Sequence, residues 1–145
     1  MPVVAAAGFN HVGQCVADLD RSRRFYVEVF GFEVARELRP PDQGSDRLLR
    51  LSPPLGMTAC YLKRDDFVLE LLHFADADPV RGDERAMNHL GLTHISLSVD
   101  DIDEALAAVE AHGGEVLADT NLGMAVFVKD PDGQLLELLT GWDKP

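Results

Sequence analysis

Four polar side chains in apolar segments carry the strongest chemical signal of this sequence: His11, Glu70, His94 and Glu137. Each glutamate has two apolar residues on either side, a pattern typical of a buried strand. A carboxylate on an apolar strand face costs several kcal/mol unless a partner compensates its charge. The presence of two such carboxylates predicts that both bind one cationic group.

A divalent metal ion meets that need. Two neutral imidazoles and two carboxylates form a mixed nitrogen and oxygen set that suits zinc, nickel, cobalt, manganese or iron, without choosing among them. Such a metal acts as a Lewis acid on a carbonyl oxygen, and a ligand glutamate can take the proton from the neighbouring carbon. No GxSxG elbow, P-loop or GxGxxG motif in the sequence indicates a competing chemistry. We therefore expect proton transfer on a small molecule, with all four side chains as metal ligands and Glu70 and Glu137 as catalytic groups.

These four residues also have a purely structural interpretation. A single histidine in a strand is more often a core or surface residue than a ligand, and a single strand glutamate can face water. The occurrence of both residue types in both halves of the chain favours the ligand set.

The two halves form an internal repeat. Phe9-Asn10-His11-Val12 matches Leu92-Thr93-His94-Ile95 at a shift of 83 positions, and Glu70-Leu71-Leu72 matches Glu137-Leu138-Leu139 at a shift of 67. The first half therefore carries 16 additional residues, and the Pro- and Gly-rich stretch 39–56 is where we place them.

Each half predicts the order strand, helix and then about three strands. The first strand of each half shows alternation, and Asp18 and Asp101 precede amphipathic stretches as helix N-caps. We expect strands at 9–16, 58–63 and 67–73, and again at 92–99, 124–129 and 134–140. The predicted fold is α+β, with two pseudo-symmetric βαβββ modules at about 8–73 and 92–141, joined by the linker 74–91 into one domain, 1–145.

Composition limits the partners. The 145 residues are 46% hydrophobic and 26% charged, and a formal charge of −12 disfavours nucleic-acid binding. We find no apolar run long enough for a membrane span and no signal peptide. The two cysteines form no CxxC motif, so we expect reduced thiols in a cytoplasmic protein.

The chain resembles the vicinal oxygen chelate superfamily, which includes glyoxalase I, methylmalonyl-CoA epimerase, extradiol dioxygenases, and fosfomycin and bleomycin resistance proteins. The matching segments are 9–13 with 18–19, 24–26 with 31–32, 91–95 with 99–101, and 130–133 with 137–138. The resemblance implies an open, cup-shaped mixed sheet around one divalent metal per site, with helices outside, and a homodimer. Whether the site closes within one chain or across two stays open.

Position 70 distinguishes the branches of this family. The dioxygenases and fosfomycin enzymes have a His, His, Glu set without a fourth protein ligand, and bleomycin-binding members lack the metal set. Glu70 beside the other three residues resembles glyoxalase I, and is close to the epimerase, where a Gln often takes this place. The resemblance thus implies a metal-dependent lyase or isomerase of glyoxalase type. An epimerase-like racemase is the nearest alternative, followed by a dioxygenase and a drug-binding resistance protein.

The substrate-binding residues depart from the glyoxalase pattern. Many bacterial glyoxalases hold glutathione with an Arg four residues after the first metal histidine and an Asn four after the first metal glutamate. Those places are taken here by Cys15 and Phe74, so the substrate stays open between a thiol adduct and an acyl thioester. The further candidates for substrate contacts are Ser96, Arg47, Arg50 and Lys63.

Overall fold

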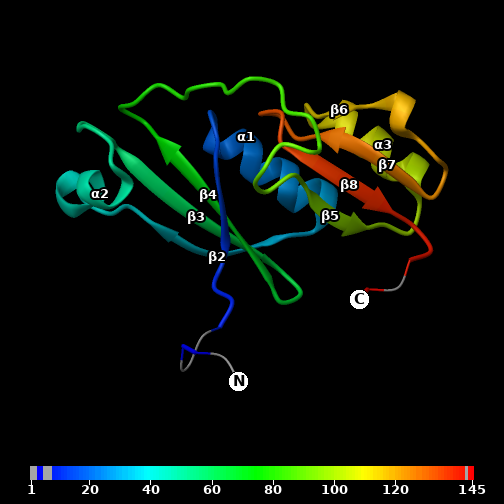
Figure 1. Cartoon of the computed structure of the whole chain (residues 1–145), viewed down its shortest axis with the longest axis horizontal. Coiled ribbons are helices and arrows are strands. Elements are labelled where there is room, and N and C mark those ends of the chain that lie inside the picture. The colour runs from blue at the N-terminus through cyan, green and yellow to red at the C-terminus, as the bar shows by residue number, and fades with distance from the viewer. Residues whose placement is uncertain (1–2, 5–7, 143) are drawn as a thin grey trace.

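Two open β-sheets of four strands each build the protein (Figure 1). The computed structural model describes residues 3–4, 8–142 and 144–145. It confirms the expected α+β fold of two βαβββ modules. The first module contains β1 (Val12–Cys15), α1 (Leu19–Arg24), the π-helical turn η1 (Phe25–Val29), β2 (Glu33–Leu38), α2 (Asp42–Leu49), β3 (Met57–Arg64) and β4 (Phe67–Phe74). The second contains β5 (Ile95–Ser98), α3 (Ile102–Ala111), β6 (Glu115–Val116), the 3₁₀ turn η2 (Ala118–Thr120), β7 (Ala125–Lys129) and β8 (Leu135–Leu139).

The two sheets have the same topology. Their strand orders are β1-β4-β3-β2 and β5-β8-β7-β6, with a parallel first pair and antiparallel pairs after it. The registers are equivalent as well, since Gly13 pairs with Glu70 in one sheet and Ser96 pairs with Glu137 in the other. The strands β1 and β5 therefore occupy corresponding sheet edges.

The helices begin where the sequence predicts. The carboxylate of Asp18 accepts a hydrogen bond from the backbone N–H of Arg21, and that of Asp101 accepts one from Glu104, each at 3.0 Å. Such caps satisfy N–H groups that the first helical turn leaves free. The turn η1 continues α1 and leads to β2 through Gly31, and α3 leads to β6 through Gly113 and Gly114. Among the described residues, every helix is too short or too polar to cross a membrane.

Several elements differ from the prediction. The expected strands 9–16 and 92–99 begin only at Val12 and Ile95, so His11 and His94 lie immediately before their strands and not within them. The physical reason is the backbone pairing between strands. The strand β4 pairs with β1 only from Val12 onward, and β8 pairs with β5 only from Ile95 onward. The positions of β2, β6 and α2 were not predicted from sequence, since β2 is exposed along its whole length and shows no apolar alternation.

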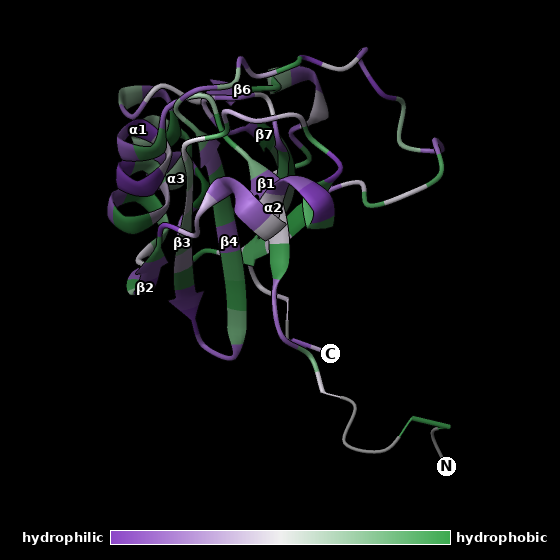
Figure 2. Ribbon diagram, turned by 90° about the vertical axis from the view of Figure 1, so that its left-hand side faces the viewer, coloured by the Kyte–Doolittle hydropathy of each residue, from purple (hydrophilic) through white to green (hydrophobic). Residues whose placement is uncertain are grey.

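One hydrophobic core unites the two modules. It contains Phe25 and Tyr26 from η1 together with Val109 of α3 and residues of both sheets, all buried. Figure 2 shows α1 and α3 on the same side of the molecule, and η1 contacts α3. The contact is close at Gly114, where an added Cβ would lie 3.0 Å from the Phe25 ring. Each fully buried large side chain contributes about 1.5–3 kcal/mol to folding, so this packing fixes one module against the other.

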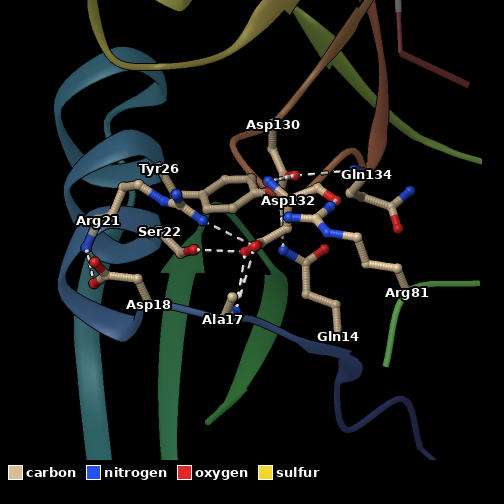
Figure 3. Close-up of polar contacts among 10 residues, drawn as sticks. All are labelled: Gln14, Ala17, Asp18, Arg21, Ser22, Tyr26, Arg81, Asp130, Asp132 and Gln134. Atoms are coloured by element: carbon tan, nitrogen blue, oxygen red, sulfur yellow. Dashed lines mark hydrogen bonds and ion pairs between the residues drawn. The ribbon is translucent and has the colours of Figure 1, made fainter. Parts of the chain in front are cut away.

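A buried polar contact crosses the same junction (Figure 3). The hydroxyl of Tyr26 donates to Oδ2 of Asp130 at 2.7 Å, and Nε2 of Gln14 donates to the same oxygen at 3.1 Å. Burial raises the pKa of Asp130, while the hydrogen bond from Tyr26 acts in the opposite direction on that pKa. The contact therefore joins η1 and β1 to the turn between β7 and β8.

A second carboxylate of that turn reinforces the junction. Asp132 accepts a hydrogen bond from Nη2 of Arg21 at 2.9 Å and another from the hydroxyl of Ser22 at 3.2 Å. Ser22 is fully buried, and the side chain of Asp132 is 14% exposed. A partly buried, hydrogen-bonded ion pair of this kind restricts the relative orientation of the modules.

Replacing Tyr26 by Phe tests the junction. The variant keeps the aromatic packing but leaves buried Asp130 without its phenol donor, so we expect unfolding to become easier by about 1–3 kcal/mol. Urea unfolding followed by circular dichroism measures this change as a lower midpoint at an unchanged slope. An unchanged midpoint would show that the hydroxyl is not needed at the junction.

Candidate metal-binding site

The first of two equivalent pairs of side chains consists of His11 and Glu70. Nε2 of His11 lies 3.5 Å from Oε1 of Glu70, and the two side chains are 32% and 11% exposed. Glu70 lies at the middle of β4, between Gly13 of β1 and Tyr61 of β3. The neighbours of Glu70 along β4, Leu69 and Leu71, point into the core, so the glutamate is on the opposite face of the sheet.

The second pair consists of His94 and Glu137. Nε2 of His94 lies 3.7 Å from Oε1 of Glu137, with 28% and 26% of the two side chains exposed. Glu137 lies between Ser96 of β5 and Phe127 of β7. The hydroxyl of Ser96 donates a hydrogen bond to Oε1 of Glu137 at 2.8 Å, so this predicted substrate-binding residue contacts a predicted metal ligand.

An aromatic ring accompanies each pair, a feature that the sequence analysis missed. The ring of Tyr61 meets that of His11 edge-on, with centroids 5.3 Å apart, and Phe127 meets His94 in the same way at 5.2 Å. Both rings could have been found from the sequence by pairing each glutamate with the preceding strand of its hairpin. In both hairpins the residue opposite the glutamate is aromatic. A hydrogen bond to Glu70 raises the pKa of Tyr61 to about 12, and partial burial acts in the same direction.

The donor atoms of each pair suit a metal ion. Nδ1 of His11 donates to Oδ1 of Asn10, which leaves the lone pair of the neutral ring on Nε2, the atom nearest Glu70. Separations of 3.5 and 3.7 Å exceed a normal hydrogen bond. One ion at metal–ligand distances of about 2.0–2.2 Å can contact both atoms of such a pair. Imidazole nitrogen and carboxylate oxygen are also the ligand types that zinc and related metals prefer.

The structure forms two separate pairs within one chain. Among the described residues, no three His, Cys, Asp or Glu side chains lie close enough together to bind one ion. Each chain therefore presents two half-sets of donors, one in each module, and the common junction holds these modules in a fixed arrangement.

A cavity of about 1060 Å³ follows the free edges of β1 and β5. Its walls include Gly13, His94 and Ser96, with Phe67 and Trp142 among the apolar residues. The two edge strands and one residue of the second pair are therefore accessible from the same space.

The remaining candidate substrate contacts lie apart from this cavity. Cys15 is exposed on β1, and Phe74 is half-buried at the end of β4, where it pairs with Met57. Arg47 and Arg50 lie on and directly after α2, both exposed. The register places Lys63 opposite Val68, on the face of the sheet that carries Glu70. By strand alternation, three of these residues share a sheet face with the first pair: Cys15, Lys63 and Phe74.

A family model connects this geometry with known proteins. The model of the Glyoxalase/Bleomycin resistance protein/Dioxygenase superfamily matches residues 8–138. The chain belongs to this superfamily, as the sequence resemblance predicted.

Individual relatives come from two branches. The chain is 31% identical over 137 residues to a putative lactoylglutathione lyase of Brassica oleracea var. gemmifera, covering 90% of this chain but 43% of that relative. It thus spans under half the length of this plant protein. It is 26% identical over 119 residues to the mitochondrial methylmalonyl-CoA epimerase of Bos taurus, covering 81% of this chain and 61% of that one. The structure of the trypanothione-dependent glyoxalase I of Leishmania major superposes with a TM-score of 0.67 at 29% identity, covering 90% and 84% of the two chains.

Proposed function

We propose that this protein is a divalent-metal-dependent enzyme of glyoxalase I type, a lyase or isomerase that moves a proton on a carbon next to a carbonyl group. The observation that carries the proposal is the His–Glu pair, which recurs at equivalent register positions in both modules. A purely structural role would not require both residue types twice on a half-buried sheet face.

We further propose that each site forms between two subunits. The strands β1 and β5 carry the two halves and are both free sheet edges, which readily accept a partner strand. In a dimer with two-fold symmetry, a contact of β1 with the partner's β5 occurs twice. Each contact would bring the first pair of one chain to the second pair of the other, giving two sites of four ligands each.

His11, His94, Glu70 and Glu137 would hold the metal through Nε2 and carboxylate oxygens. When bound, the metal supplies positive charge that stabilises the negative charge developing on the substrate oxygen. The side chain of Glu137 is more exposed than that of Glu70, at 26% against 11%. Glu137 is thus the more accessible base: it takes the proton from carbon and returns it to the adjacent carbon, so that no oxidant or reductant is consumed.

The substrate class follows from this chemistry. Proton transfer between adjacent carbons suits a hemithioacetal, a thiol adduct of a 2-oxoaldehyde, and the names of the lactoylglutathione lyase relatives support this class. Cys15 and Phe74 stand where many glyoxalases hold glutathione, which supports a thiol other than glutathione.

An epimerase is the second candidate. The similarity to methylmalonyl-CoA epimerase favours it. In that reaction the proton is removed beside a thioester carbonyl and returned to the opposite face of the same carbon, which suits a site with two carboxylates.

Replacing Glu137 by Gln tests the proposed function. We expect Zn²⁺- or Co²⁺-loaded wild-type protein to convert the hemithioacetal of methylglyoxal, or else to racemise methylmalonyl-CoA, and to lose activity on chelation. Glu137→Gln keeps the shape of the side chain and removes the base, so kcat should fall by about 10²–10⁴-fold without loss of fold. Full activity of this variant, or wild-type activity that survives chelation, would refute the mechanism. Glu110→Gln, on the exposed face of α3, is the matched control.

Mixed dimers test the sharing of sites. Glu70→Ala removes a ligand of the first pair and Glu137→Gln disables the second, so each homodimer should be inactive. Co-expression of the two variants with different tags produces heterodimers in which one of two shared sites has all four ligands. We expect about a quarter of the wild-type activity in the mixture. If each site instead forms within one chain, the mixture will be as inactive as the separate variants.

A further inference from the structure

The linker that precedes β5 carries His94 at its end. Because β5 begins only at Ile95, sheet pairing does not hold the backbone of His94. The segment 89–94, which the structure describes in full, contains neither helix nor strand. Fixing the backbone of such a residue costs about 1–2 kcal/mol of conformational entropy. The position of this proposed ligand relative to Glu137 therefore depends on what orders the linker.

The side chain of Arg85 orders this loop. Its guanidinium donates to three backbone carbonyls: Nη1 to that of Leu92 at 3.0 Å, and Nη2 to those of Leu90 at 2.9 Å and His89 at 3.3 Å. In the part of the chain that the structure describes, the hydrogen bonds of this side chain all end on the same loop. The planar fork of N–H donors of an arginine suits several acceptors at fixed angles. Arg85 thus binds the stretch of backbone that ends at His94.

Gly91 lets the loop bend around the guanidinium. Its φ of +122° is a conformation that residues with a Cβ rarely adopt. An added Cβ would also lie 3.3 Å from Nη2 of Arg85. The carbonyls on both sides of this glycine, those of Leu90 and Leu92, therefore reach the same side chain.

The connection from this loop to the second pair is short. Thr93 follows the last of the three carbonyls, and its Oγ1 forms a hydrogen bond with Nδ1 of His94 at 2.8 Å. Arg85 and Thr93 also line a cavity of about 30 Å³ together with Leu135, which begins β8 two residues before Glu137. The arginine therefore packs where β5 and β8 begin to pair.

We propose that Arg85 is a positioning residue of the second pair: it fixes the loop 89–92 and thereby holds His94 in place to bind a metal ion together with Glu137. This inference rests on the proposed function. The shift of 83 positions that aligns the two histidines puts Pro2 where Arg85 stands. The sequence thus repeats the histidine without repeating the arginine.

Replacing Arg85 by Gln in the full-length protein tests this role, with Co²⁺ as the probe. Loss of an outer partner of a metal site weakens metal binding by about 10–100-fold. Because Arg85 acts through the backbone of the loop, we expect calorimetry to show the lower end, about tenfold, and the visible spectrum of the bound ion to change. Removal of a positive charge alone would strengthen the binding of a cation, so the direction of the change distinguishes positioning from electrostatics.

Arg81→Gln is the matched control. Arg81 is an exposed arginine of the same linker, and its side chain contacts the carbonyl of Asp132 at 3.5 Å. This variant removes the same charge and leaves the loop 89–92 intact, so its Co²⁺ affinity should equal or exceed that of the wild type. A loss as large as that of Arg85→Gln would refute the specific role of Arg85.

Gly91→Ala tests the loop without removing the guanidinium. The added Cβ disfavours the observed backbone conformation and crowds Arg85, so we expect weaker Co²⁺ binding here as well. The double variant with Arg85→Gln should bind no more weakly than the weaker single variant, because both changes remove one loop conformation. Additive losses would show two independent effects and contradict the proposal.

A measurement on metal-free protein separates this role from the proposed function. Leu90 is 99% exposed, so chymotrypsin has access to the loop. Cleavage after Leu90 should be several-fold faster in metal-free Arg85→Gln than in the wild type or Arg81→Gln, because proteolysis follows the population of open conformations. Equal cleavage rates would show that Arg85 does not order the loop.

The possible failures are distinguishable. If Arg85→Gln binds Co²⁺ with wild-type affinity and spectrum, the role of Arg85 is refuted and the proposed function stands. If wild-type protein binds neither Co²⁺ nor Zn²⁺, both proposals are refuted together.

Discussion

The nearly buried carboxylate of Glu70 determines what the surrounding strands must supply. Its side chain is 11% exposed in a strand of apolar residues, and the imidazole of His11 lies 3.5 Å away, beyond a normal hydrogen bond. Removing such a charge from water is costly when its partners compensate it incompletely. In the proposed site a divalent ion between the two donor atoms would supply the missing compensation, and the same reasoning applies with less burial at Glu137. The strands, their register and the repeat serve to place these carboxylates.

The packing of the modules decides how the two pairs can meet. One core and the contact of Tyr26 with Asp130 hold the modules together through η1 and α3. Within this arrangement β1 and β5 stay free along a common cavity. We propose a second copy of the chain as the partner, because it would offer both complementary edges with the proposed ligands. The superfamily includes several chemistries on one fold, so the side chains of the site, and not the fold, indicate the function.

The sequence predicted the features that repeat or alternate. Asp18 and Asp101 were predicted as caps from their spacing to the following residues, and Glu70 and Glu137 from their apolar neighbours, because both signals are local. The strand β2 was not located, since its residues are exposed and its pairing with β3 is a tertiary effect. Tyr61 was missed for a related reason: its contact with Glu70 depends on hairpin register, which residue types alone do not specify. The cytoplasmic location and the binding of a divalent metal stay predictions.

Diffraction from crystals of the Co²⁺-loaded protein, measured at the cobalt absorption edge, would show whether pairs from two subunits bind one ion. We expect one anomalous peak for each chain, in contact with His11 and Glu70 of one subunit and with His94 and Glu137 of its partner. Peaks at one pair alone, peaks at other residues, or a fully loaded protein without peaks at either pair would contradict this expectation.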